Sequence, residues 1–309
     1  MRYFNANTSR QYNALGLPTD FNEVITNADI DENGFNPKIN LNYQVSKNSL
    51  LYATVAKGFR LGGVNDPVPQ AFCADELAAL GEDTPDSFES DDLWNFELGY
   101  KGVLNNGRVT LNASTFYNRW SGIQQFRRLL CGFGFTANAG RAAIYGLDLD
   151  VKAKLSRSFE VGAGLGLLNA TITEGGAGLD AQDGNRILFT PSYTGAVNLK
   201  YFKDINENAS LFANAGWNFV GERFSTYAVQ NAGADQSEIA ARTLDAYSLL
   251  NLRVGLAFSN VEVSLYVNNV TGTAANFGDV VSLAAEAPGR PRYTTSRPRS
   301  IGLQFRTFF

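Results

Sequence analysis

Apolar and polar residues alternate along most of the chain, which is the pattern of β-strands that have one apolar and one polar face. In the clearest run, residues 94–101, every second residue is Trp, Phe, Leu or Tyr, and the others are Asn, Glu, Gly and Lys. The pattern predicts about eleven strands of roughly ten residues, the length that a tilted strand needs to cross a bilayer. These strands are expected at residues 39–45, 51–59, 94–101, 109–117, 143–154, 161–167, 193–201, 211–219, 250–258, 261–267 and 301–309, with the end of another strand near residues 2–4.

The connections between the predicted strands are alternately short and long. Tight turns such as Asn105-Asn106-Gly107 close one side of each strand pair, because Asn and Gly tolerate positive φ. The long, polar connections span residues 61–92, 121–141, 173–190, 222–245 and 272–296. Transmembrane β-barrels have short periplasmic turns and long extracellular loops. We therefore predict an all-β fold, an antiparallel up-and-down transmembrane β-barrel of the cell outer membrane, with its C-terminus on the periplasmic side.

Charged residues occupy the polar side of the predicted strands. Asp148, Asp150, Lys152 and Lys154 share one face of a single strand. Such a face is unfavourable in a dry core but is stable against a water-filled lumen. A soluble β-sandwich also has alternating strands, but it rarely combines this regular order of short and long loops with charges at every second position.

The composition excludes several classes of protein. The chain of 309 residues has a formal net charge of −4 and contains no histidine. A negative net charge argues against nucleic acid as a partner. Without histidine, neither a Ser-His hydrolytic site nor a His-ligated metal site can form, so we expect no enzyme, no cofactor and no metal site. No segment approaches the ~18 apolar residues of a transmembrane helix, and no signal peptide opens the chain, which predicts a fragment of a longer precursor.

Several segments resemble motifs of the TonB-dependent outer-membrane receptors and occur in the family's order. They are YATVAKGFRLGG at residues 52–63, FELGYK at 96–101, NAG at 138–140 with YGLD at 145–148, VNNVT at 267–271 and RPRSIG at 297–302. The chain also ends in an aromatic residue, Phe309, which is typical of outer-membrane proteins that the barrel assembly machinery handles. The resemblance covers the chain from about residue 36 to its end.

The resemblance implies a barrel of about 22 strands closed by an N-terminal plug. Residues 1–309 are then expected to be the C-terminal portion of that barrel, about 11–12 strands, without a plug domain. The implied partners are outer-membrane lipid and lipopolysaccharide, the TonB-ExbB-ExbD system through the missing plug, and a ferric siderophore or similar ligand. Haem, cobalamin and carbohydrate are the alternative cargoes in this family.

Five residues in or beside the predicted loops are candidates for ligand contacts. The aromatic side chains of Trp120, Phe126 and Tyr227 could stack on a ligand in the outer vestibule. The guanidinium groups of Arg127 and Arg128 could attract an anionic ferric siderophore or lipopolysaccharide phosphates. The alternative interpretation is that the aromatics anchor the barrel rim at the membrane interface and that the arginines keep the loop soluble.

Cys73 and Cys131 fall in consecutive long loops on the predicted extracellular side. This is an oxidising location, so the two thiols are the candidates for a disulfide that ties the loops together. The alternative is that the two loops never meet. A metal site is not expected from two sulfur atoms without histidine.

The leading functional hypothesis is a receptor for TonB-energised uptake of a ferric siderophore or a similar scarce nutrient. The second hypothesis is a passive porin or structural barrel of about twelve strands that closes on itself. A stable open channel in planar bilayers distinguishes the second hypothesis from the first. An outer-membrane enzyme would need an activity that does not use histidine.

Overall fold

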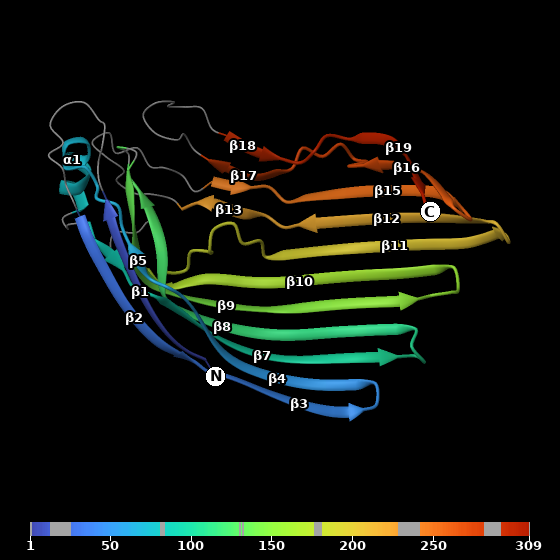
Figure 1. Cartoon of the computed structure of the whole chain (residues 1–309), viewed down its shortest axis with the longest axis horizontal. Coiled ribbons are helices and arrows are strands. Elements are labelled where there is room, and N and C mark those ends of the chain that lie inside the picture. The colour runs from blue at the N-terminus through green and yellow to red at the C-terminus, as the bar shows by residue number, and fades with distance from the viewer. Residues whose placement is uncertain are drawn as a thin grey trace.

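The computed structural model describes residues 2–12, 26–80, 84–129, 131, 133–175, 181–227, 242–280 and 292–308. Eleven strands form one antiparallel sheet, shown in Figure 1, and each strand pairs with the next strand of the series along the chain. From edge to edge they are β3 (Lys38–Ser46), β4 (Ser49–Arg60), β7 (Asp91–Leu104), β8 (Val109–Arg128), β9 (Gly134–Lys154), β10 (Phe159–Glu174), β11 (Tyr193–Asn206), β12 (Ala209–Val220), β15 (Tyr247–Phe258), β16 (Val261–Asn268) and β19 (Ser300–Thr307). The predicted all-β, antiparallel up-and-down sheet and its eleven strands are confirmed.

The short connections all lie at one end of the sheet, which we call the turn end, and the long ones lie at the other, the loop end (Figure 1). In the turn between β7 and β8, Asn105, Asn106 and Gly107 have φ angles of 51°, 52° and 85°. These residue types adopt that left-handed backbone at low cost, so the hairpin closes where the sequence predicts it. Phe309, the predicted C-terminal aromatic residue, lies outside the described residues.

The loop end contains regular elements in segments that were predicted to be polar loops. They are α1 (Gln70–Leu80) and three small ribbons, β5 (Gly63–Val64) with β6 (Ser87–Phe88), β13 (Arg223–Thr226) with β14 (Arg242–Leu244), and β17 (Asn276–Val280) with β18 (Arg292–Thr295). Within the described ranges, no helix is both long and apolar enough to cross a membrane.

The strands of the β8–β9 hairpin are longer than predicted, so the prediction of a loop over residues 121–141 was wrong. The two strands contain 20 and 21 residues and remain paired from Val109–Ala153 to Arg128–Gly134. Gly122 and Gly140 are skipped in the pairing and have φ angles of 64° and 55°. This irregularity shifts the side-chain alternation, which explains why a period-two pattern failed to predict the upper half of the hairpin.

A further ribbon lies beside this sheet. The strand end expected near residues 2–4 is the start of β1 (Arg2–Tyr12), which pairs along its whole length with β2 (Thr26–Asn36). β2 leads through Pro37 directly into β3. β2 was not predicted from the sequence, because Asn, Asp and Glu occupy most of its positions and no apolar alternation marks it.

Large apolar side chains cover one face of the sheet and are exposed. Phe96 and Leu98 are 43% and 57% accessible, and the ring of Phe96 lies 6.3 Å from that of Tyr117 on the neighbouring strand. The two buried apolar clusters in the described part of the chain both lie at the loop end, and neither covers this face. A sandwich with a sealed interior is therefore excluded for these strands, and the face is suited to contact with lipid.

The opposite face carries the polar side chains predicted for it. The hydroxyl of Tyr52 donates to Glu97 Oε1 on the next strand, and the ammonium group of Lys101 lies 5.3 Å from the Tyr52 ring. Asn112 Nδ2 donates to Asp150 Oδ1 at 3.3 Å. Polar groups on this face find partners on adjacent strands, and a polar face of this kind is compatible with contact to water.

Candidate functional site

The polar face ends at the loop end in a buried carboxylate, Asp91. Its residue is only 3% accessible, and its two oxygen atoms accept four hydrogen bonds. Oδ1 accepts from the backbone N–H of Arg60 at 3.0 Å. Oδ2 accepts from Nε and Nη2 of Arg60 and from the indole N–H of Trp120, the last at 2.9 Å. These four hydrogen bonds offset the cost of burying the Asp91 carboxylate.

Trp120 is held from two sides within this group. Besides its hydrogen bond to Asp91, the centre of its ring lies 5.0 Å from the guanidinium carbon of Arg60. Alternation along β4, β7 and β8 places all three side chains on the polar face. Trp120 was a predicted ligand contact, whereas neither Arg60 nor Asp91 was. The ion pair could have been suspected from the register of two neighbouring strands, since Arg60 lies opposite Asp91.

Tyr227 packs against the same apolar cluster as Trp120. The cluster consists of four buried residues, Ile123, Ala142, Ile172 and Ala181. Tyr227 is half-buried there, and this burial raises the pKa of its hydroxyl. The structure therefore brings together two of the five predicted ligand contacts, although they come from segments about 100 residues apart in the chain.

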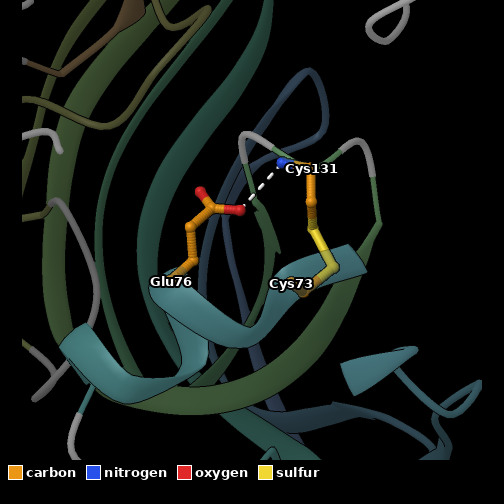
Figure 2. A group of neighbouring side chains, drawn as sticks. All are labelled: Cys73, Glu76 and Cys131. Carbon is orange, nitrogen blue, oxygen red and sulfur yellow. Dashed lines mark hydrogen bonds between the residues drawn. A yellow bond between two sulfur atoms is a disulfide. The ribbon is translucent and has the colours of Figure 1, made fainter. Parts of the chain in front are cut away.

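Cys73 and Cys131 form a disulfide, the first of the two alternatives that the sequence left open. The bond joins α1 to the end of the β8–β9 hairpin, as Figure 2 shows, with a Cα–Cα distance of 5.4 Å. In the same group the carboxylate of Glu76 accepts the backbone N–H of Cys131 at 2.8 Å. These three residues are the one set of possible metal ligands in the described ranges, but both sulfur atoms are already bonded to each other.

Phe126 and Arg127 lie on the upper part of β8, apart from the cluster that holds Trp120 and Tyr227. The Phe126 side chain is 67% accessible. Arg127 pairs in register with Phe135, which packs in the second buried cluster beside Cys73. The Nη1 atom of Arg127 is buried and has no hydrogen-bond acceptor among the described residues. The side chain of Arg128, the fifth predicted contact, lies outside the described residues.

Two further arginines of the loop end lack a carboxylate partner in the described part of the chain. Arg223 is 5% accessible; its Nη2 donates to the carbonyl oxygen of Asn276 at 2.7 Å, and its buried Nη1 finds no acceptor within the described ranges. Arg186 Nη2 donates to two backbone carbonyl oxygens, at 3.3 and 3.4 Å. Both guanidinium groups lie over aromatic rings, those of Tyr247 and Phe224. No pattern in the sequence distinguished these arginines from ordinary loop residues.

Comparison with known proteins agrees with this architecture. A family model described as TonB dependent receptor-like, beta-barrel matches residues 1–270. The metal-pseudopaline receptor CntO of Pseudomonas aeruginosa is 25% identical over 263 residues, which are 84% of this chain and 32% of that protein. The chain thus spans less than half of the length of this relative.

Solved structures share the fold at low sequence identity. The ferric yersiniabactin uptake receptor FyuA from Yersinia pestis has a TM-score of 0.72 at 19% identity, over 99% of this chain and 42% of the receptor. The siderophore receptor PiuA from Acinetobacter baumannii has a TM-score of 0.64 at 14% identity, over 93% of this chain and 38% of the receptor. On the strength of the match to residues 1–270, the chain belongs to the TonB-dependent receptor β-barrel family, whose members are transport receptors and not enzymes.

Proposed function

We propose that this chain forms part of the wall of an outer-membrane receptor that takes up a ferric siderophore or a similar metal chelate with energy from the TonB system. The observation that carries the proposal is the sheet itself. One face exposes large apolar side chains that no other described residues cover. The other face is polar, and the loop end beyond it contains the two buried apolar clusters. The relatives CntO, FyuA and PiuA, by their names, are receptors for metal-pseudopaline, ferric yersiniabactin and a siderophore.

In this proposal the loop end faces the cell exterior and the turn end faces the periplasm. Outer-membrane lipid covers the apolar face, and lipopolysaccharide surrounds the loop end. β19 runs toward the turn end, so the C-terminus is proposed to lie on the periplasmic side. Residues 1–309 are proposed to be the C-terminal portion of the barrel, and a plug elsewhere in the full receptor is proposed to contact TonB-ExbB-ExbD.

The direction of the edge strands argues against closure of these eleven strands on themselves. β3 and β19 are the two edges of the sheet, and both run from the loop end to the turn end. Joining them directly would create a parallel pair, whereas up-and-down barrels are antiparallel throughout. Closure therefore needs an odd number of additional strands between these edges.

The guanidinium group of Arg127 favours an anionic ligand. A buried donor without an acceptor is unfavourable in the free protein and is satisfied when an anionic oxygen atom binds. Phe126, the preceding residue of β8, points to the opposite face of the strand, so its exposed ring takes no part in this contact.

Uptake by cells tests the proposed function. A strain that lacks the full-length gene should lose accumulation of at least one radiolabelled ferric siderophore, and the intact gene on a plasmid should restore it. Unchanged uptake of a broad panel of ferric siderophores would refute the proposal. A large, stable conductance of the purified receptor in planar bilayers would support the porin instead.

A matched pair of variants tests the role of Arg127. Arg127→Gln should weaken binding of the accepted chelate by roughly tenfold or more, since a charge-assisted hydrogen bond is lost. Arg141→Gln is the control, because Arg141 is already engaged in an exposed ion pair with Glu174 at 3.1 Å. If both variants bind the chelate with equal affinity, Arg127 is not a ligand contact.

A further inference from the structure

We infer that Glu32 is a positioning residue that, together with the Arg60–Asp91 pair, fixes both ends of the first loop, residues 61–80 and 84–90. The first loop then forms a stationary wall of the loop end. The inference rests on the proposed function in one respect. If the receptor binds a ligand at the loop end, loops other than the first loop are expected to move over it.

The carboxylate of Glu32 joins the two ends of the first loop. Oε2 accepts the backbone N–H of Gly62 at 2.8 Å, and Oε1 accepts the backbone N–H of Ser90. Glu32 comes from β2, so it belongs to neither of the strands that the loop connects. A carboxylate that accepts two backbone N–H groups makes charge-assisted hydrogen bonds, which are stronger than neutral ones.

Gly62 is needed for this close approach. A Cβ atom at this position would lie 2.6 Å from Glu32 Oε1 and 2.3 Å from the carbonyl oxygen of Phe88. Both contacts are far shorter than van der Waals contact, and one of them is to backbone, so a side chain would separate the loop ends. The glycine in the family-like segment at residues 52–63 therefore has a local structural role here.

Two carboxamide side chains of the β8–β9 hairpin bind the same loop ends. Gln124 Nε2 donates to the carbonyl oxygens of Leu61 and Glu89, at 2.8 and 3.0 Å. Asn138 makes a pair of hydrogen bonds with the backbone of Glu89, accepting its N–H at 2.6 Å and donating to its carbonyl oxygen at 2.7 Å. Glu32, Gln124 and Asn138 thus bind the two loop ends from three different strands.

The rest of the first loop is fixed to the hairpin at two more places. Asn65 exchanges two hydrogen bonds with the backbone of Thr136, at 2.7 and 2.8 Å. Farther out, the disulfide between Cys73 and Cys131 joins α1 to the hairpin (Figure 2). With attachments at its base, its middle and its helix, the loop has little freedom to move as a lid.

Hydrogen exchange of the full-length receptor in detergent, without any chelate, tests the inference. In Glu32→Ala, the amides of Gly62 and Ser90 should exchange roughly 10-fold to 100-fold faster, because each loses an acceptor that carries a charge. In Glu32→Gln, one carbonyl oxygen remains, so only one of these two amides should keep its protection. Asp31→Asn is the matched control, since the neighbouring Asp31 accepts a hydrogen bond from Asn7 instead.

The thermal midpoint of the barrel separates positioning from general stability. It should stay nearly unchanged in all three variants, since the loop ends lie outside the strand ladder of the sheet. Equal exchange of both amides in wild type and Glu32→Ala overturns the inference, and so does a uniform increase over the whole barrel. Because no chelate is present, failure of the proposed uptake function would leave this result unaffected.

Discussion

Removal of the disulfide gives the sharpest test of how the loop end is stabilised. The perturbation is the double variant Cys73→Ala and Cys131→Ala. In the native protein the disulfide between these two cysteines closes a segment with a sequence separation of 58 residues. A disulfide that closes a segment of this length lowers the chain entropy of the open state, which stabilises the closed state by about 4 kcal/mol. The existing ladder between β7 and β8 shortens the closed path to roughly 30 residues, which lowers the estimate to about 3.5 kcal/mol.

Proteolysis measures this local opening directly. The segment between Arg60 and Lys101 contains neither lysine nor arginine, so trypsin has no site there, whereas a glutamate-specific protease can cut at Glu76 in α1. Cleavage of an ordered helix requires local opening, and its rate follows the open population when closing is fast. The double variant should therefore be cut at Glu76 roughly 300-fold faster than the oxidised protein.

A reference site in the same molecule controls for protease activity. Glu207 lies in the turn between β11 and β12, at the opposite end of the sheet, and its cleavage rate should not change. Equal cleavage at Glu76 in the oxidised protein and the double variant would refute the reasoning. It would mean that the apolar cluster around Val68 and Phe135 holds α1 without help from the disulfide.

Three further predictions concern single side chains. Asp91→Ala leaves four donors without their acceptor and should lower the unfolding free energy of the loop end by about 2–3 kcal/mol in denaturant titrations followed by tryptophan fluorescence. Asp92→Ala, which removes only a partly exposed pair at 3.9 Å, should cost less than about 0.5 kcal/mol, and equal losses would contradict the reasoning. Because burial raises the pKa of Tyr227, its contribution to stability is complete below the unfolded pKa and is lost as pH rises through the higher folded value. Tyr227→Phe should thus flatten the decline of the thermal midpoint above roughly pH 10, and an unchanged decline would count against a buried hydroxyl. Leu98→Arg on the apolar face should lower the stability of the barrel in the bilayer by about 2–4 kcal/mol and reduce the amount of heat-resistant, folded barrel in outer-membrane fractions. Asn112→Arg on the polar face should be tolerated, and the reverse order would show that the two faces are assigned wrongly.

The sequence by itself determined the sheet, because in an antiparallel strand the side-chain period is local. Leu98 and Glu97 point to opposite faces whatever the neighbouring strands are, and Asn105-Asn106-Gly107 closes its turn through backbone preferences alone. The same local logic identified the order of short and long connections. It failed where the period was interrupted, at the irregularity of Gly122 and Gly140, and where polar residues fill the strand, as in β2.

The candidate site depended on tertiary structure, because its contacts join residues that are distant in the chain. The sequence indicated that Cys73 and Cys131 could pair, since both lie in consecutive loops of a predicted oxidising compartment, but only the folded hairpin brings their Cα atoms to 5.4 Å. Trp120 was singled out as an aromatic residue at a strand end, yet its partners Arg60 and Asp91 follow from the register of three strands.

Glu32 shows the limit of sequence reasoning most clearly. Nothing near it in the chain identifies it as the acceptor for Gly62 and Ser90, which are 30 and 58 positions away. A period in the sequence specifies which way a side chain points, whereas its hydrogen-bond partners are specified by the approach of other segments. The strands and their faces were therefore determined locally by the sequence, and the loop end was decided only by the tertiary structure, because its hydrogen bonds and its disulfide are long-range.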